Sequence, residues 1–383
     1  MKRSSQKLWG LMGLLVLATW NPAAAQDDTN AWKPVENVIL VSIDGLRREE
    51  VFAGVDPDLF AVDGLQNKAD LERRFVSQDL EESRQKLLPF LWGTVASKGQ
   101  IFGSPMANSQ VKCSNGLYFS YPGYSEMLCG YADPKVDSNA KRNNSNVTVL
   151  EWLSQQDGFS GRVAAYTSWD VFPYIINQAR SGIPVNSGWA PFEQRLGAEA
   201  QRLNELQLQW PRFFEGVRWD QITLEGALAE MEIHQPRVLY VSLGETDDWA
   251  HQGRYDLYLD AAWRNDQALK TLWEKAQAMD AYRDQTALVV VTDHGRGDGR
   301  EGWKSHGKDL PGSEYIWMAV MGPNVPEWGV RQEVKATQAQ TAATVAKLLG
   351  LDYQGTDQKI APALPLMSQS SSTARQPIEA SKQ

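Results

Sequence analysis

Short apolar runs constrain the fold more than any other feature of this sequence. Four of them are continuous rather than alternating, and a fifth is weaker. They are Val38–Ile43, Val238–Leu243, Ala287–Val291 and Tyr315–Met321, with Val163–Tyr166 as the weaker one. Runs of this kind are typical of parallel strands that are covered on both faces. Helical patterns lie between them, notably from about Tyr255 to Met279 and from Ala339 to Leu349. The order predicts an α/β fold with a doubly wound, mostly parallel sheet.

One catalytic domain over residues 26–367 is the predicted organisation. No repeat and no linker rich in Pro, Gly or Ser interrupts the region between Trp32 and Leu366. The stretch 191–235 has helical patterning without a clear strand, which indicates a small helical insertion that could cap one side of the sheet. Residues 368–383 are rich in Ser, Gln, Thr and Ala, so we expect a disordered tail there.

The first 25 residues have the pattern of a signal peptide. Lys2, Arg3 and Lys7 flank the start of an apolar run from Leu8 to Trp20, and three alanines then end at Ala25. The run is shorter than the roughly 20 residues that a membrane span needs, so we expect cleavage and export to the periplasm or the medium. The formal charge would change from −9 to −12, because three basic residues leave. This acidic balance argues against a nucleic-acid partner.

Export would also make the two cysteines interpretable. Cys113 and Cys129 lie 16 positions apart, and an oxidising compartment permits a disulfide between them. Such a bond would stabilise the fold by roughly 3 kcal/mol in the chain-entropy model. Two buried free thiols are the alternative, and the expected compartment favours the bond.

Acidic residues follow three of the predicted strands directly. Asp44 follows the first, Asp247 and Asp248 follow the second, and Asp293 follows the third. Ligands of open α/β sheets bind at the carboxyl ends of the strands, so these side chains should meet in space. A single acidic residue there is commonly a turn or helix cap, whereas three of them favour a shared site.

Three of the four histidines accompany these acidic residues. His251 follows Asp247 by four positions, His294 is next to Asp293, and His306 lies in a nearby loop between glycines. The fourth, His234, stands apart and is expected at the surface. Mixed nitrogen and oxygen ligands suit zinc, manganese or iron better than calcium or magnesium. We therefore predict two metal sites at this edge of the sheet.

A nucleophile for hydrolysis is available in the aromatic stretch Tyr118-Phe119-Ser120-Tyr121-Pro122-Gly123-Tyr124-Ser125. Either serine hydroxyl could serve, and the residues alone do not choose between Ser120 and Ser125.

Five blocks together resemble the alkaline phosphatase superfamily, in the branch of type I phosphodiesterases, nucleotide pyrophosphatases and phosphoglyceromutase-like metalloenzymes. They are Ile-Asp44-Gly, Ser120-Tyr-Pro-Gly-Tyr, Glu-Thr-Asp247-x-x-x-His251, Thr-Asp293-His294-Gly and Ser-His306-Gly. The resemblance covers about Val38 to Pro323 and implies a hydrolase of phosphoric esters with two divalent metal ions, zinc by analogy or manganese. It implies Ser120 as the nucleophile that forms a phosphoseryl intermediate. The implied ligand sets are Asp247, His251 and His306 for one metal, and Asp44, Ser120, Asp293 and His294 for the other.

The resemblance also implies a phosphate-binding asparagine about 20 residues after the nucleophile. Asn139 is the preferred candidate in a window that also holds Lys141, Arg142, Asn143 and Asn144. Lys304 is a second candidate phosphate contact, or else an ordinary exposed lysine.

Several neighbours of the predicted ligands have two possible roles. Asp248 would orient His251 or merely begin a helix. The aromatic residues Tyr121, Tyr124, Trp249 and Trp303 would wall a substrate pocket or, with more weight, belong to the core or rim.

Other members of the fold fit this chain less well. Neither cysteine has the Cys/Ser-x-Pro-x-Arg setting of a sulfatase, and the 127 residues from Ser120 to Asp247 are too few for the inserted domain of a phosphoglycerate mutase. A membrane-bound phosphoethanolamine transferase would need further apolar helices. A protein that binds phosphoesters without catalysis is the non-enzyme alternative. The expected partner is a small-molecule phosphoester, whereas the choice between monoester and diester and the oligomeric state stay open.

Overall fold

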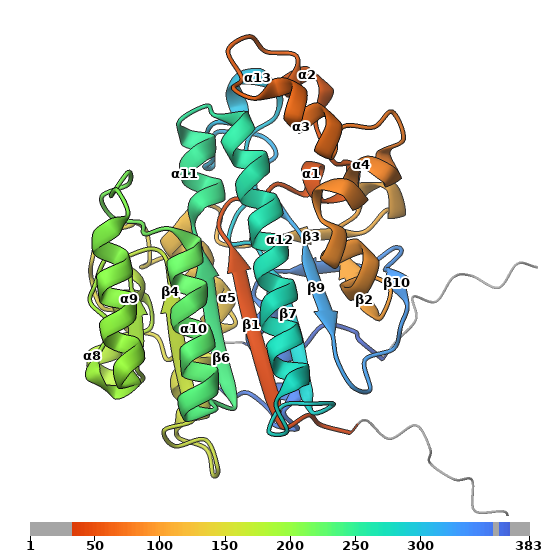
Figure 1. The fold of residues 1–383 in the computed structure, drawn as a ribbon. Helices are drawn as coiled ribbons and strands as arrows, with labels where there is room; N and C mark the ends of the chain where they lie inside the picture. Colours follow the sequence, from red (N-terminus) through yellow and green to blue (C-terminus); the bar gives the residue numbers. More distant parts are fainter. Residues whose placement is uncertain (1–32, 355–359, 368–383) are drawn as a thin grey trace, which may run out of the picture. The chain divides into compact units, whose positions relative to one another are not determined.

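An eight-stranded, mostly parallel sheet forms the centre of the fold in the computed structural model, which describes residues 33–354 and 360–367 (Figure 1). The strand order is β10-β2-β9-β7-β1-β6-β4-β5. The strands are β1 (Asn37–Ile43), β2 (Gly99–Phe102), β4 (Val163–Thr167), β5 (Val185–Ser187), β6 (Val238–Leu243), β7 (Thr286–Val291), β9 (Met318–Met321) and β10 (Gly329–Val330). The predicted signal peptide and C-terminal tail lie outside the described residues.

The register of the central strands brings their carboxyl ends to one level. β1 pairs in parallel with β6 and β7, with Ile43 opposite Leu243 and Ser42 opposite Val291. All residues of these three strands are buried, as their apolar runs predict. The residues that follow each strand therefore emerge side by side at the same edge.

The predicted strand Tyr315–Met321 is wrong as a single element. It divides into β8 (Tyr315–Ile316) and β9, on either side of Trp317. The fully buried Trp317 ring occupies the break, and its indole N–H donates to the Leu46 carbonyl at 3.0 Å. β9 runs antiparallel between β7 and β2, while β8 joins a second sheet of order β11-β3-β8. The other strands of that sheet are β3 (Gln110–Lys112) and β11 (Lys335–Thr337).

Helices cover both faces of the large sheet. In Figure 1, α10 (Asp220–His234) and α12 (Tyr255–Ala278) lie in front of it, and α5 (Ser120–Cys129) lies behind it. α14 (Gln340–Leu348) and α6 (Val149–Ser154) pack beside α5. The predicted helices near 255–279 and 339–349 are thus confirmed. The stretch 191–235 contains α9 (Ala198–Gln209) and α10, and α10 packs directly on β4 and β6 as part of the front layer.

The remaining helices are short and mostly lie in connections. Between β1 and β2 they are α1 (Arg48–Ala53), α2 (Pro57–Phe60), α3 (Lys68–Phe75), α4 (Leu80–Leu87) and a π-helix at Leu91–Val95. Elsewhere they are α7 (Phe172–Ile175), α8 (Gln178–Ser181), α11 (Glu245–His251), α13 (Gly299–Gly302) and 3-10 turns at Pro105–Ala107 and Gln194–Leu196. Among residues 33–354 and 360–367, every helix is too short or too polar to cross a bilayer.

Candidate active site

The three predicted acidic residues meet where β1, β6 and β7 end. Asp44 directly follows β1, and Asp293 lies two residues after the end of β7. Asp247 lies in the first turn of α11. The Gly45 N–H donates to Asp293 Oδ1 at 3.1 Å, which joins two of these strand ends. Gly45 has φ +58°, and a Cβ there would lie 2.8 Å from Asp247 Oδ1. The packing of the carboxylates therefore requires glycine at this turn.

Asp44, Asp293 and His294 form a first candidate ligand group. His294 Nε2 lies 3.3 Å from Asp44 Oδ1 and 3.3 Å from Asp293 Oδ2. His294 Nδ1 lies 2.9 Å from the Gly295 carbonyl oxygen, so Nδ1 carries the proton and Nε2 presents a lone pair. Both of these carboxylate oxygens are buried and accept no hydrogen bond. Three lone pairs thus converge in a buried space, an arrangement that a metal cation satisfies.

The ionisation of the first group agrees with this interpretation. Burial, together with the charges of the neighbouring carboxylates, raises the pKa of Asp44 and of Asp293 well above the usual range. Burial lowers the pKa of His294 to about 4, which keeps the imidazole neutral. The site disfavours uncompensated negative charge, and a divalent cation would compensate it.

Asp247, His251 and His306 lie together as a second candidate ligand group, and His294 also converges with Asp247 and His306. His251 Nε2 lies 3.2 Å from Asp247 Oδ2 and 3.1 Å from His306 Nε2. His306 Nδ1 lies 3.0 Å from the Tyr118 carbonyl oxygen, which again leaves Nε2 as the ligand atom. The rings of His306 and His294 stack with centroids 3.8 Å apart, so the two groups adjoin. The four-residue spacing of Asp247 and His251 places both on one side of α11, as predicted.

Ser120 is the serine that the fold brings to the ligand groups. It begins α5, is 6% exposed, and its Oγ lies 3.4 Å from His294 Nε2. A Cβ at Gly123 would collide with the Asp293 carbonyl oxygen, so glycine permits this close approach of α5. Ser125 is one turn further along and accepts a hydrogen bond from Asn144 Nδ2 at 3.0 Å instead. We call Asp44, Ser120, Asp247, His251, Asp293, His294 and His306 the seven-residue cluster.

The two candidate phosphate contacts have different positions. Asn139 Oδ1 accepts the N–H of Tyr121 at 2.9 Å, so its amide lies beside the first turn of α5 and Ser120. Lys304 Nζ pairs with Glu301 at 2.9 Å, at the surface of the loop that leads to His306. The structure thus places Asn139 beside the turn that carries Ser120, whereas the Lys304 ammonium pairs with a carboxylate outside the cluster.

The aromatic neighbours of the ligands are mostly buried supports. The Tyr124 hydroxyl donates to Asp44 Oδ2 at 2.9 Å, and the Tyr121 hydroxyl donates to the Arg142 carbonyl oxygen at 2.6 Å. Trp249 packs in an aromatic cluster with Phe213, Phe214 and Trp219. Trp303 is 3% exposed and packs against Tyr255 and Tyr258. Asp248 lies in the acidic first turn of α11, and His251 pairs with Asp247 instead of Asp248.

The predicted disulfide is absent, and both cysteines are buried free thiols. Cys113 Sγ lies 3.3 Å from the Asp293 carbonyl oxygen, at the end of β7. Cys129 ends α5, where its Sγ lies 3.7 Å from Asn144 Nδ2. The two thiols therefore have different neighbours, and the 16-residue separation that made a bond plausible does not determine where each side chain points.

Arg296 is a site residue that the sequence patterns did not identify. It is 1% exposed, and its guanidinium pairs closely with Asp247 Oδ1. Its Nε donates to the Trp303 carbonyl at 2.6 Å and its Nη2 donates to the Lys304 carbonyl at 2.9 Å. Burial alone would raise the pKa of Asp247, but Arg296 and then His251 outweigh it and hold that pKa well below the usual range. The one available signal was a charged residue within the glycine-rich stretch Gly295-Arg296-Gly297.

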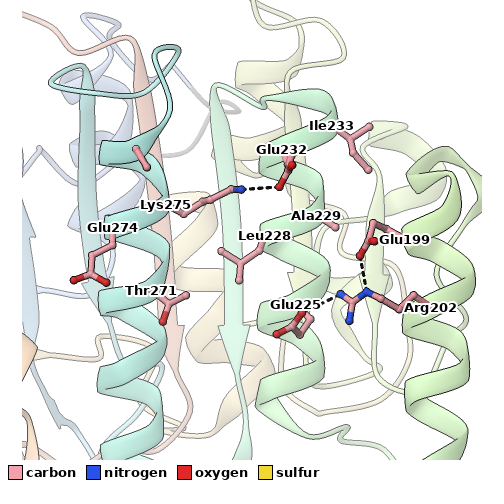
Figure 2. A pocket seen from close by; sticks show the side chains of 11 residues that line it. Glu199, Arg202, Glu225, Leu228, Ala229, Glu232, Ile233, Thr271, Glu274 and Lys275 are labelled. Carbon is pink, nitrogen blue, oxygen red and sulfur yellow. Dashed lines mark hydrogen bonds and ion pairs between the residues drawn. The ribbon is translucent and has the colours of Figure 1, made fainter.

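One cavity among the described residues lies away from the cluster. It is a groove of about 710 Å³ whose lining residues come from α9, α10 and α12. Figure 2 shows that its cations are already paired, Lys275 with Glu232, and Arg202 with Glu199 and Glu225. None of the seven cluster residues lines it, so the groove is separate from the candidate site at the strand ends.

Comparison with solved structures gives the fold. An alkaline phosphatase named PafA has a TM-score of 0.57 with 10% identity, and the match covers 87% of this chain and 99% of PafA. The C-terminal periplasmic domain of EptC from Escherichia coli, in complex with Zn, has a TM-score of 0.52 with 13% identity and coverage of 88% and 89%. A phosphonate monoester hydrolase of Agrobacterium radiobacter has a TM-score of 0.50 with 11% identity and coverage of 83% and 74%. No protein-family model and no curated protein matches the sequence. The matches confirm the predicted alkaline phosphatase-like fold.

Proposed function

We propose that this chain, which has the fold of the alkaline phosphatase superfamily, is a two-metal hydrolase of small-molecule phosphoric esters. One observation carries the proposal. Asp44 Oδ1 and Asp293 Oδ2 are buried without a hydrogen-bond donor, both face His294 Nε2 at 3.3 Å, and Ser120 Oγ lies 3.4 Å from the same nitrogen. The proposed cation site and the proposed nucleophile, the Ser120 hydroxyl, thus both lie beside the His294 imidazole.

The donor atoms fit zinc or manganese. Asp44, Asp293 and His294, which converge, would hold one ion together with Ser120 Oγ. Asp247 and His306, which converge with His294, would hold the other together with His251, whose Nε2 lies 3.2 Å from Asp247 and 3.1 Å from His306. Imidazole nitrogens with carboxylate oxygens are common ligands of these metals, whereas calcium and magnesium prefer oxygen alone. When bound, two such ions lower the pKa of a coordinated hydroxyl and neutralise charge on both apical oxygens of phosphorus.

Ser120 is the proposed nucleophile. It loses its proton to solvent, and Oγ attacks phosphorus in line while the bond to the ester oxygen breaks. The departing oxygen takes up a proton from solvent, so the products of this step are the free alcohol and phosphoserine at position 120. Water then attacks the phosphoserine, restores Ser120 and releases phosphate, or a phosphomonoester when the substrate is a diester. Asn139 can donate to a phosphate oxygen through Nδ2 while its Oδ1 stays bonded to Tyr121.

The names of the structural neighbours support this class of reaction. They include an alkaline phosphatase, a phosphonate monoester hydrolase and a domain crystallised with Zn. We also propose export to the periplasm or the medium, based on the pattern of residues 1–25. Cell fractionation and N-terminal sequencing of the mature protein would test it, and an uncleaved cytoplasmic chain would contradict it.

A substrate panel with matched serine variants tests the function. Purified protein with zinc or manganese should cleave at least one of p-nitrophenyl phosphate, bis-p-nitrophenyl phosphate and a phenylphosphonate ester. Ser120→Ala should abolish turnover, whereas Ser125→Ala is the control because Ser125 bonds Asn144. Elemental analysis should find about two equivalents of metal. No cleavage of any phosphoester, cleavage of a sulfate ester only, or full activity of Ser120→Ala would each contradict the proposal.

A further inference from the structure

We infer that Arg296 makes the two metal positions unequal, so that the first ligand group binds a divalent ion tightly and the second ligand group binds one weakly. This inference rests on the proposed function, and it makes turnover depend on the concentration of free metal. The two groups differ in the partners of their carboxylates and in their charge, and Arg296 causes both differences.

The carboxylates of the first ligand group each keep one oxygen without a hydrogen-bond donor. Asp44 Oδ1 and Asp293 Oδ2 are buried, accept no hydrogen bond, and each lie 3.3 Å from His294 Nε2. Their other oxygens are already bonded, Asp44 Oδ2 to the Tyr124 hydroxyl and Asp293 Oδ1 to the Gly45 N–H. A cation can therefore bind between the two free oxygens without breaking a contact of either carboxylate.

Asp247 of the second ligand group already has a cation as its partner. Its Oδ1 pairs closely with Arg296 Nη1, and its Oδ2 lies 3.2 Å from His251 Nε2. A metal ion at this group has to share Oδ1 with the guanidinium or replace it there. The weakening of this ion pair opposes metal binding, and the first ligand group has no such opposing contact.

The Arg296 guanidinium is held beside Asp247 by contacts that do not involve Asp247. Nε donates to the Trp303 carbonyl at 2.6 Å and Nη2 donates to the Lys304 carbonyl at 2.9 Å, and the residue is 1% exposed. A Cβ at Gly45 would lie 2.7 Å from Nη1, so Nη1 also lies against the turn after β1. The guanidinium is thus fixed within the site, and its permanent charge acts on any cation at Asp247.

The formal charge of the two groups differs by two units when the imidazoles are neutral, as metal ligands are. Asp44 and Asp293 give the first group a charge of −2, which a divalent ion brings to zero. Asp247 and Arg296 together give the second group a charge of zero, which a divalent ion raises to +2. An uncompensated charge in a site of low dielectric constant is unfavourable, so the second ion should bind at least about tenfold more weakly than the first.

Solvent reaches the second ligand group but hardly reaches the first. The side chains of Asp293 and His294 are fully buried, whereas His251 is 39% exposed and Asp247 is 15% exposed. A weakly bound ion at the second group can therefore exchange with the solution. Because the proposed reaction needs both ions, the occupancy of the second group sets the fraction of active protein at a given concentration of free metal.

Equilibrium dialysis against buffered free zinc, followed by elemental analysis, measures the two affinities directly. The wild type should bind one equivalent of zinc at least about tenfold more tightly than the other. His306→Ala should lose the weaker equivalent and keep the tighter one. Arg296→Gln should tighten the weaker equivalent by at least about tenfold, because Asp247 is then left without its cation.

Two further variants serve as controls. Arg296→Lys keeps the positive charge, so the ratio of its two dissociation constants should stay closer to that of the wild type than the ratio of Arg296→Gln does. Arg202→Gln removes a half-exposed arginine that pairs with Glu199 and Glu225 on α9 and α10, and it should keep the ratio of the wild type.

The direction of the Arg296→Gln effect separates this role from a purely structural one. If Arg296 only held the segment before His306 in place, its loss would loosen the second ligand group and weaken the weaker equivalent further. The inference requires the opposite change. The wild type and His306→Ala still test the inference if Arg296→Gln does not fold, because neither measurement uses that variant.

Cleavage of the phosphoester panel by the same samples distinguishes this inference from the function. Unequal affinities that converge in Arg296→Gln, without cleavage of any ester, support the inference and refute only the proposed function. Cleavage by a wild type whose two dissociation constants differ by less than about tenfold leaves the function standing and overturns the inference. An unchanged or larger ratio in Arg296→Gln also overturns it, as does loss of the tighter equivalent in His306→Ala or the absence of zinc binding.

Discussion

Replacing Arg296 by glutamine should destabilise the protein strongly, and bound metal should reverse part of the loss. Arg296 is buried and connects Asp247 on α11 with the carbonyl groups of Trp303 and Lys304. Lys304 lies two residues before His306. It therefore holds together the two segments that carry the second ligand group. Without the guanidinium, Asp247 keeps its negative charge in a space that already contains Asp44 and Asp293.

The expected loss follows from the contacts that disappear. Removing one partner of a buried ion pair costs about 3–5 kcal/mol, and two further hydrogen bonds from a charged donor are lost as well. Because Asp247 is 15% exposed and water can reach it, we expect about 4 kcal/mol rather than the full sum. At about 2 °C per kcal/mol for a domain of this size, the unfolding midpoint should fall by about 8 °C. Arg296→Lys keeps the positive charge but cannot make all three contacts of the guanidinium, so its unfolding midpoint should fall by about half as much.

Calorimetry with and without metal is the appropriate assay. In the presence of a chelator Arg296→Gln should show the full loss, and with excess zinc the loss should shrink, because cations at the ligand groups compensate Asp247. Arg202→Gln is the matched control, since Arg202 is half exposed and its pairs with Glu199 and Glu225 contribute at most about 1 kcal/mol. Equal losses for Arg296→Gln and Arg202→Gln, or a loss that zinc does not change, would refute the reasoning.

Three further predictions concern metal, thiols and pH. Chelation should lower the unfolding midpoint more at pH 8 than at pH 5. The pKa values of Asp44 and Asp293 are raised in the metal-free fold, so these carboxyl groups are protonated at low pH, and the fold loses stability as they become charged at higher pH. An equal drop of the midpoint at both pH values would contradict this. Thiol titration in denaturant without reductant should find two reactive thiols per chain, since Cys113 and Cys129 are free, and a count of zero would restore the disulfide. Burial raises the pKa of Asp266 to about 7. The wild type should therefore lose stability relative to Asp266→Asn as pH rises from about 4 through 7, which thermal unfolding across that range can measure. A constant difference in stability between the two proteins would show that Asp266 does not titrate there.

Local patterns were sufficient to locate the strands that build the site. The runs before Asp44, Asp247 and Asp293 are apolar throughout because both faces of β1, β6 and β7 are buried, so no alternation obscures them. Tyr315–Met321 has the same composition but is two strands, because the Trp317 ring fills the core at the break and its N–H finds an acceptor in another segment. Composition reports that a segment is buried, and not with which neighbours its backbone pairs.

The sequence by itself determined the alternation of strands and helices, the acidic residues at the strand ends and the histidines that accompany them. These follow from periodicity and spacing, which are local. Only the tertiary structure decided that Cys113 and Cys129 point to different neighbours, that Arg296 joins Asp247 to the His306 loop, and that Asn139 meets the first turn of α5. Each of these depends on where side chains from distant segments point after the sheet has formed, and the direction of a side chain in the core is set by packing rather than by its neighbours in sequence.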